Sequence, residues 1–581
     1  RNAAETVFDR TVERQGLNDV KDQMMNPLKH LTFGGRIYGD NLVAGKTYTG
    51  IYTDTDFKGW SLKSRKPAQE HQIRLALATL QCENPADWET MLNKTISKVQ
   101  TDKKAKQKTR QWWNSYWKRS YVFIDSGKIG SDYWKVGRNY QLFRYMLGCN
   151  AYGSEPTKFN GGLFTFDPVH IDSTRVFTPD FRLWGGGTMT AQNQRLVYFP
   201  MLKSGDFDMM KPQFDFYERM LDNAKLRTKV YWNHEGACFS EQIENFGLPN
   251  LAEYDWKPRH EGFPVGVDSN PWLEYTWDTA LEFALMMFDA HLYNNEPIVP
   301  HLPFIESLLT FFDEHYSYLA LRRGTNKHDG DGHLVLYPGS ACETYKMATN
   351  ATSTVAALKV ITEKLLELPE LDATQREHWS GFLKRIPPIS HREVQGKKTI
   401  SPAKMWERIN NSEVPSLYHV YPWRIYGIGQ PELQTAINTY LYDPEAIEFR
   451  SHIGWKQDNI FAACLGLTEE AERLTLLKLS DGPHRFPAFW GPGFDWTPDH
   501  NWGGSGMIGL QEMLLQTNGD SILLFPAWPE NRDVHFKLHA PKQTTVEVTL
   551  RNNKIEFMQV EPKTREKDIV ICSSHFYLRR D

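Results

Sequence analysis

The sequence has no marked excess of charge of either sign. Lys and Arg together number 67 and Asp and Glu number 71, which gives a formal net charge of −4 and an isoelectric point near 6.6. Its one basic run, Lys103–Lys108, is typical of a solvated helix face. Because nucleic-acid binding normally needs a clustered basic excess, we predict no nucleic-acid partner.

Long apolar runs are also missing. A transmembrane helix needs about 18 or more consecutive apolar residues, and none occurs, so we predict no membrane span. The chain begins Arg1-Asn2-Ala3, without Met or the apolar segment of a signal peptide. Such a start is typical of a processed or truncated chain.

Cysteine is scarce and widely spaced. No C-x-x-C pair exists, so neither a zinc site nor a dense disulfide framework is indicated. We predict no metal and no cofactor. The six residues are Cys82, Cys149, Cys238, Cys342, Cys464 and Cys572.

Aromatic residues are abundant by contrast, at 13% of the chain with 19 Trp and 25 Tyr. Their flat faces suit stacking against sugar rings, and they fill cores equally well. A chain of 581 residues is long enough for two or three folded units.

The patterning divides the chain into four parts. Alternating apolar and polar residues with Gly-rich turns predict the end of a β domain over residues 1–75, and a charged stretch predicts a helical linker over 76–110. Helical periodicity then dominates residues 111–518, in repeated helices separated by long loops that predict an α/α toroid. Period-two alternation returns after about residue 519 and predicts a small β domain to the end of the chain.

Glu343 follows a Gly-rich loop and precedes a predicted helix near Ser353, in the segment YPGSACET (337–344). A half-buried carboxylate in such a loop has a raised pKa and stays protonated, as a general acid must. A helix cap or a first-turn Glu is the alternative interpretation.

Asp499 lies in FPAFWGPGFDWTPDHNWGGSG (486–506). Its surroundings of Gly, Pro and Trp favour ligand contact, because glycine allows close approach and aromatics offer stacking faces. A helix N-cap is the equal alternative.

Two further polar segments have the composition of a binding site. AQNQRLVYFP (191–200) offers Gln192 and Asn193, whose amides suit sugar hydroxyls or a water, although such residues are also ordinary capping material. His234 and Glu235, in YWNHEG (231–236), are expected on a loop that faces the same cleft.

Seven segments, in order over about 370 residues, resemble the α-L-fucosidases and α-L-galactosidases of glycoside hydrolase family 95 and related Bacteroidetes proteins of unknown function. Residues 160–164 (NGGLF) are similar to N-L-Q-G-I-W, 193–200 to N-L-E-M-N-Y-W-P, and Glu343 falls at the Glu of S-P-S-L-S-P-E-N. The others are LYHVYP (417–422), the pair Gly454-Trp455, DHNWGG (499–504), and LQEMLLQ (510–516) with LFPAWP (524–529).

The resemblance implies a multidomain α and β protein, with an (α/α)6 toroid flanked by an N-terminal β-sandwich remnant and a small C-terminal β domain. It implies an inverting glycosidase on an oligosaccharide or polysaccharide, with Glu343 as general acid and Asp499 as general base through an amide-held water. His419, Asn501, Trp455 and Trp502 are then expected as sugar contacts. The resemblance also implies a periplasmic or extracellular location.

One departure from the family concerns the water clamp. The family has two Asn in N-x-N, and here the first of them is Ala191 while Asn193 remains. Gln192 or Gln194 substitutes for it, or the substrate differs, or activity is reduced. Two alternatives therefore stay open, a glycan-binding protein without turnover and a polysaccharide lyase using His419 with Arg450; the oligomeric state is not predicted.

Overall fold

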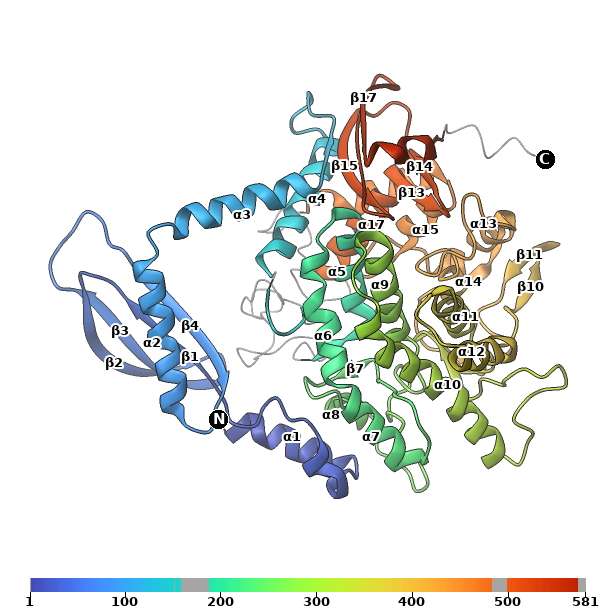
Figure 1. The fold of residues 1–581 in the computed structure, drawn as a ribbon, viewed down its shortest axis with the longest axis horizontal. Coiled ribbons are helices and arrows are strands. Elements are labelled where there is room, and N and C mark those ends of the chain that lie inside the picture. The colour runs from blue at the N-terminus through green and yellow to red at the C-terminus, as the bar shows by residue number, and fades with distance from the viewer. Residues whose placement is uncertain (1, 151, 158–187, 483–498, 573–581) are drawn as a thin grey trace. The chain divides into compact units, whose positions relative to one another are not determined.

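The computed structural model describes residues 2–150, 152–157, 188–482 and 499–572 (Figure 1). They form two compact units, and the chain passes from one to the other within α3, between Tyr116 and Trp117. No helix among the described residues is both long and apolar enough to cross a membrane.

The first unit combines short antiparallel strand pairs with helices. β1 pairs with β4 and β2 with β3, and Trp88 of α2 donates a hydrogen bond from Nε1 to the Ala78 oxygen of β4. The elements are α1 (Asn2–Arg14), η1 (Asn18–Gln23), β1 (Leu31–Tyr38), β2 (Leu42–Tyr52), β3 (Thr55–Ser64), β4 (Arg74–Gln81), α2 (Pro85–Thr101) and most of α3 (Ala105–Arg119).

β4 extends past residue 75, where we predicted the strands to end. Its residues RLALATLQ include several helix formers, but the alternating side chains pair with β1 over the full strand, from Arg74 opposite Tyr38 to Gln81 opposite Leu31. Tertiary pairing therefore overrides the local helix preference.

The second unit is built mainly of helices. They are α4 (Asp132–Cys149), α5 (Ala191–Ser204), α6 (Lys211–Arg219), α7 (Leu221–Trp232), α8 (Leu251–Tyr254), α9 (Thr279–Asn294), α10 (Leu302–Arg322), α11 (Thr352–Glu367), α12 (Ala373–Arg385), α13 (Leu433–Tyr442), α14 (Pro444–Glu448), α15 (Asp458–Cys464), α16 (Thr468–Leu479) and α17 (His500–Leu514), with the turns η3 (Phe207–Met209), η4 (Val299–His301), η5 (Pro415–Leu417) and η6 (Lys563–Asp568).

These helices form an α/α toroid. Successive inner helices contact one another in the row α11, α9, α5, α17 and α15. Beside this row, α12 packs against α11, α10 against α9, and α16 against α15. Inner helices such as α9 and α17 are buried along most of their length. The predicted fold class is confirmed. In chain order, a β-rich region comes first, the helical toroid follows, and β-strands close the described chain.

The strands of the second unit are β5 (Tyr121–Ile124), β6 (Met189–Thr190), β7 (Gln242–Ile243), β8 (Gly339–Ala341), β9 (Tyr345–Ala348), β10 (His391–Val394), β11 (Lys397–Ile400), β12 (Arg408–Ile409), β13 (Leu515–Asn518), β14 (Ser521–Leu524), β15 (Val534–Ala540), β16 (Thr544–Arg551), β17 (Lys554–Glu561) and β18 (Ile569–Ile571). The C-terminal sheet has the order β17-β16-β15-β5. Its edge strand β5 precedes the toroid in the chain, which the prediction of a separate domain from residue 519 did not include.

The close crossing of α17 and α5 depends on glycine. A Cβ at Gly504 would lie 1.9 Å from the Leu196 oxygen of α5. Further along, Gln511 of α17 donates from Nε2 to the Pro200 oxygen at 3.0 Å. The contacts advance in the same direction on both helices, so the two helices are parallel and begin at the same end.

Candidate active site

Glu343 lies in the turn of the β8–β9 hairpin. Cys342 turns the backbone with a φ of 53°, and β12 extends the hairpin by pairing with β9. The chain after β12 returns to Glu343, where Asn411 donates from Nδ2 to Glu343 Oε2 at 2.7 Å. Glu343 is therefore not a helix cap; the residue at that position of α11 is Ala351.

The Glu343 carboxyl opens into a cavity of about 330 Å³. Its walls combine indole rings, amides and two carboxylates, which is a typical composition for a sugar site. The described lining residues are Thr190, Gln192, Asn193, Gln242, Glu253, Trp256, Asn270, Trp272, Leu273, Glu343, Asn411, Ser412 and Trp455.

The surroundings of Glu343 favour its protonated form. Burial, followed by the negative charge of Glu413, raises the pKa of Glu343 to about 8, although Lys346 and the Asn411 amide oppose this rise. The Glu343 backbone N–H donates a hydrogen bond to Glu413 Oε2 at 3.4 Å, which places the two side chains next to each other. At neutral pH Glu343 therefore carries a proton.

Glu413 belongs to a buried ion network beside the cavity. Arg195 pairs with Glu413 at 3.1 Å and with Glu282 at 2.5 Å, and its guanidinium lies 4.8 Å from the centre of the Tyr418 ring. Gln192 donates from Nε2 to Glu413 Oε2 at 2.5 Å. The network fixes Glu413, and with it the charge that acts on Glu343.

Glu241 is a third carboxyl near Glu343. It is fully buried, and neither of its carboxyl oxygens has a hydrogen-bond partner among the described residues. Burial, followed by the charges of Glu343 and Glu413, raises the pKa of Glu241 far above its ordinary value. These surroundings therefore favour the protonated form of Glu241.

Asp499 is the N-cap of α17, as one of our two interpretations expects. Its Oδ1 accepts the backbone N–H groups of Asn501 and Trp502 at 2.9 and 3.1 Å. Burial raises the pKa of Asp499 to about 6, although the Trp502 N–H and the charge of Lys478 lower it. Oδ2 has no hydrogen-bond partner within the described part of the chain.

The parallel packing of α5 and α17 brings two predicted segments to one end of the toroid. Asp499 precedes α17, and Gln192 and Asn193 lie in the first turn of α5. Lys478, which acts on the pKa of Asp499, donates from Nζ to the Gly454 oxygen at 2.9 Å, next to Trp455 of the cavity wall. Asp499 itself is not among the described lining residues.

The structure thus brings together four predicted residues, Glu343, Gln192, Asn193 and Trp455, around one cavity. Three other predicted sugar contacts, His419, Trp502 and Asn501, are not among the described lining residues. His419 is buried, which lowers the pKa of its imidazole to about 3, and Trp502 donates from Nε1 to the Lys478 oxygen at 2.7 Å. Asn501 is buried in the first turn of α17, after Asp499.

His234 and Glu235 do not line the cavity. His234 stacks on Trp232 and lies 3.0 Å from His315, measured between ring nitrogens, while Glu235 forms an exposed ion pair with Lys229 at 2.8 Å. The NGGLF segment at 160–164 falls outside the described residues.

The segment 251–273 contributes five lining residues that were not predicted from the sequence. The signal available was two exposed Trp among Asn, Asp and Pro, in DWKPRHEGFPVGVDSNPW (255–272). That segment lacks a counterpart among the motifs that we matched. Glu413 was not predicted either, because nothing local in the sequence marks a residue that acts on Glu343 from 70 positions away.

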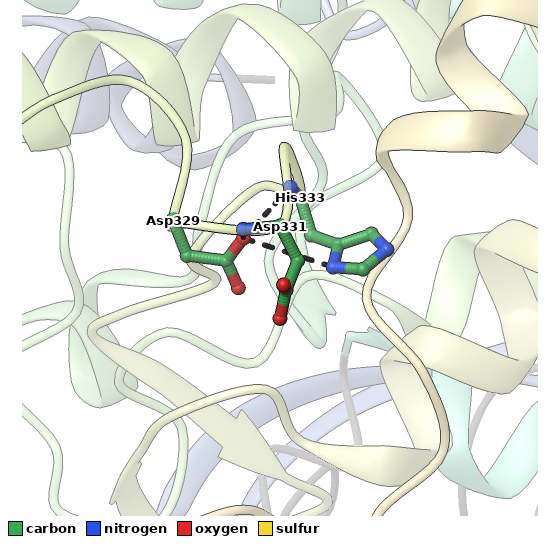
Figure 2. Close-up of side chains that lie close together, drawn as sticks. All are labelled: Asp329, Asp331 and His333. Carbon is green, nitrogen blue, oxygen red and sulfur yellow. Dashed lines mark hydrogen bonds and ion pairs between the residues drawn. The ribbon is translucent and has the colours of Figure 1, made fainter.

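One group of side chains in the described residues is close enough to hold a metal ion. Asp329, Asp331 and His333 lie on one turn, with potential ligand atoms within 4.8 Å of one another (Figure 2). Asp329 Oδ1 already accepts the backbone N–H groups of Asp331 and His333, at 3.0 and 2.9 Å. These hydrogen bonds within the turn are sufficient to hold the three side chains close together. None of the three residues lines the cavity.

Comparison with known proteins yields matches of two kinds. Residues 1–122 match the family DUF5703_N, described as a domain of unknown function (DUF5703). No curated protein matches the chain. A solved structure described as "Putative kojibiose phosphorylase from human microbiome" is similar, with a TM-score of 0.55 and 12% sequence identity, covering 92% of this chain and 77% of that one. At this identity the likeness shows a shared fold.

Proposed function

We propose that this protein is a glycoside hydrolase that removes a terminal α-L-fucosyl, α-L-galactosyl or similar residue from a glycan, with inversion at the anomeric carbon. The observation that carries the proposal is Glu343, a carboxyl held protonated at neutral pH in a cavity of indole rings and amides. A protonated acid at this position can deliver its proton to the glycosidic oxygen as the bond to the leaving group breaks.

Asp499 is the proposed base. Its position at the same end of the toroid as Asn193 supports this role, and so does its pKa of about 6, which leaves it ionised at neutral pH. Asn193 is the amide we assign to the water, because the Gln192 amide is engaged by Glu413. Glu253, which also lines the cavity, is the carboxylate to compare with Asp499.

Water fits the cavity better than phosphate as the attacking group. Phosphate carries negative charge and is usually held by Arg, Lys or a helix N-terminus. The first turn of α5 reaches the cavity through Gln192 and Asn193, but no Lys, Arg or His occurs among the described residues that line it. This lack of a cationic side chain favours water over phosphate. The same lack of a cationic side chain in the described wall disfavours a uronate, whose carboxylate a lyase would need to neutralise.

The test is product stereochemistry followed by NMR on aryl α-L-fucosides, aryl α-L-galactosides and pectic oligosaccharides, each with and without inorganic phosphate. We expect an inverted free sugar whose release does not depend on phosphate. Glu343→Gln and Asp499→Asn should each lower kcat by about 100-fold or more, while Glu253→Gln retains turnover.

Other results of this experiment would contradict particular parts of the proposal. Retention of configuration would overturn the inverting scheme, and a sugar phosphate as product would establish phosphorolysis. Loss of activity in Glu253→Gln with activity kept in Asp499→Asn would transfer the base role to Glu253. Glycan binding without turnover of any substrate would identify a binding protein.

A further inference from the structure

Two tryptophans of the cavity wall are unusually exposed. Trp256 and Trp272 have 46% and 37% of their surface accessible, and their rings meet edge to face with centroids 6.2 Å apart. Both line the cavity that Glu343 opens into. Indole faces left open beside a cavity are available for stacking with a ligand.

The segment that presents Trp256 is held rigidly by Arg259. Its guanidinium lies 4.0 Å from the centre of the Tyr254 ring and 4.8 Å from that of Phe263. It also donates to the backbone oxygens of Tyr254, Pro264 and Val267 at 2.6 to 3.0 Å. Trp256 therefore sits on a preorganised loop, which limits the entropy lost on binding.

Trp272 is hydrogen-bonded to the two segments that position Glu343. Its Nε1 donates to the Asn410 oxygen at 3.3 Å, one residue before Asn411, which holds the Glu343 carboxyl. Its own backbone oxygen accepts from Lys346 Nζ at 2.7 Å, and Lys346 belongs to β9 of the Glu343 hairpin. The position of the indole is thus fixed relative to the acid.

We propose that Trp256 and Trp272 form a subsite for a second, uncharged pyranose of the substrate, next to the sugar that Glu343 releases. The inference rests on the proposed function for the identity of the released sugar. The apolar face of a pyranose stacks on an indole, and both indoles line the same cavity as Glu343. The described wall contains no Lys, Arg or His to neutralise a uronate, so an uncharged ring is preferred to an anionic one.

The experiment uses the full chain carrying Glu343→Gln, applied to a microarray of neutral and acidic oligosaccharides that also displays single monosaccharides. We expect neutral glycans of two or more units to be retained in preference to monosaccharides and uronate-containing glycans. Adding Trp256→Ala or Trp272→Ala should weaken that binding by about tenfold or more, and Trp256→Phe should weaken it less.

Trp256→Ala is the more direct variant, because Trp272 also contacts the loop that holds Glu343. Trp60→Ala, which removes a tryptophan of β3 that is 72% exposed, is the control and should leave binding unchanged. Binding that survives both cavity substitutions, retention of monosaccharides as strong as that of oligosaccharides, or retention of no glycan would overturn the subsite.

Turnover is measured separately, with the wild-type chain on the retained glycans. Binding that depends on Trp256 without any turnover would leave the subsite standing and overturn the hydrolase. Turnover that is insensitive to both substitutions would support the hydrolase and overturn the subsite.

Discussion

Glu343 and Asp499 have raised pKa values for the same first reason, burial, but their charged neighbours act in opposite directions. Glu413 adds a negative charge beside Glu343, whereas Lys478 places a positive charge near Asp499. The proposed mechanism requires Glu343 protonated and Asp499 ionised. We therefore expect kcat/KM to be bell-shaped in pH, rising near pH 6 and falling near pH 8.

The two limbs of that profile should move independently. Glu413→Gln removes the negative charge and leaves Arg195 in place, so the pKa of Glu343 falls and the alkaline limb moves to lower pH. Lys478→Met removes the charge that lowers the pKa of Asp499, so the acid limb moves to higher pH. Initial rates across pH 4 to 10 check both; a limb that moves in the wrong variant would contradict the assignment of acid and base.

The buried acid should also reduce stability at high pH. The pKa of Glu343 is raised from 4.5 to about 8 in the folded chain, so stability present below pH 4.5 is lost as pH rises toward 8. We expect the Tm of Glu343→Gln minus that of wild type to increase from pH 5 to pH 8 and then to level off.

Thermal melts at pH 5, 7 and 9 measure that difference. Glu235→Gln is the pH-independent control, because Lys229 lowers the pKa of Glu235 below its ordinary 4.5 and Glu235 is therefore ionised at all three pH values. Its Tm difference from wild type should not change between them. A Tm difference for Glu343→Gln that does not change with pH would show that Glu343 is not held protonated.

Among the elements, the pair α5 and α17 determines the geometry of the proposed water site. Gly504→Ala would place a methyl carbon against the Leu196 backbone oxygen, which cannot rotate away. We expect a loss of about 3 kcal/mol in the free energy of unfolding and a fall in kcat, because α17 must move away from α5. Urea denaturation and kinetics measure the two effects.

Gly381→Ala in α12 is the matched control. Its new methyl group would meet only the end of the Arg385 side chain at 3.4 Å, so the higher helix propensity of Ala should stabilise the fold slightly. If Gly504→Ala were equally harmless, the close crossing would not position Asp499.

These elements show what the sequence could predict. Helical periodicity, period-two alternation and the ordered motifs were sufficient for the toroid, for the terminal β regions and for placing Glu343 beside Gln192, Asn193 and Trp455. The wall that carries Trp256 and Trp272 could not be predicted in the same way. Its residues come together through backbone hydrogen bonds to Arg259, and no periodic pattern encodes such contacts.

At the scale of the whole molecule, the chain should unfold in two steps. The residues up to Tyr116 and the described residues from Trp117 onward are separate compact units, and β5 ties the start of the second unit to its C-terminal sheet through the pairing of Val122 with Phe536. Val122→Ala, at a fully buried site, should cost about 2 kcal/mol and lower only one calorimetric transition.

Leu92→Ala in α2 is the reciprocal variant and should lower the other transition. Differential scanning calorimetry of both variants checks the expectation. A single transition that both substitutions shift equally would mean that the units unfold together.

The wall segment 251–273 has a consequence for engineering. It is continuous in sequence, its part around Trp256 is braced by its own Arg259, and it contains neither Glu343 nor Asp499. The proposed tryptophan subsite and the proposed acid are therefore encoded in different stretches of the gene. A library randomised at Trp256 and Asn270 should retarget the protein to other glycans while the acid on its hairpin continues to work.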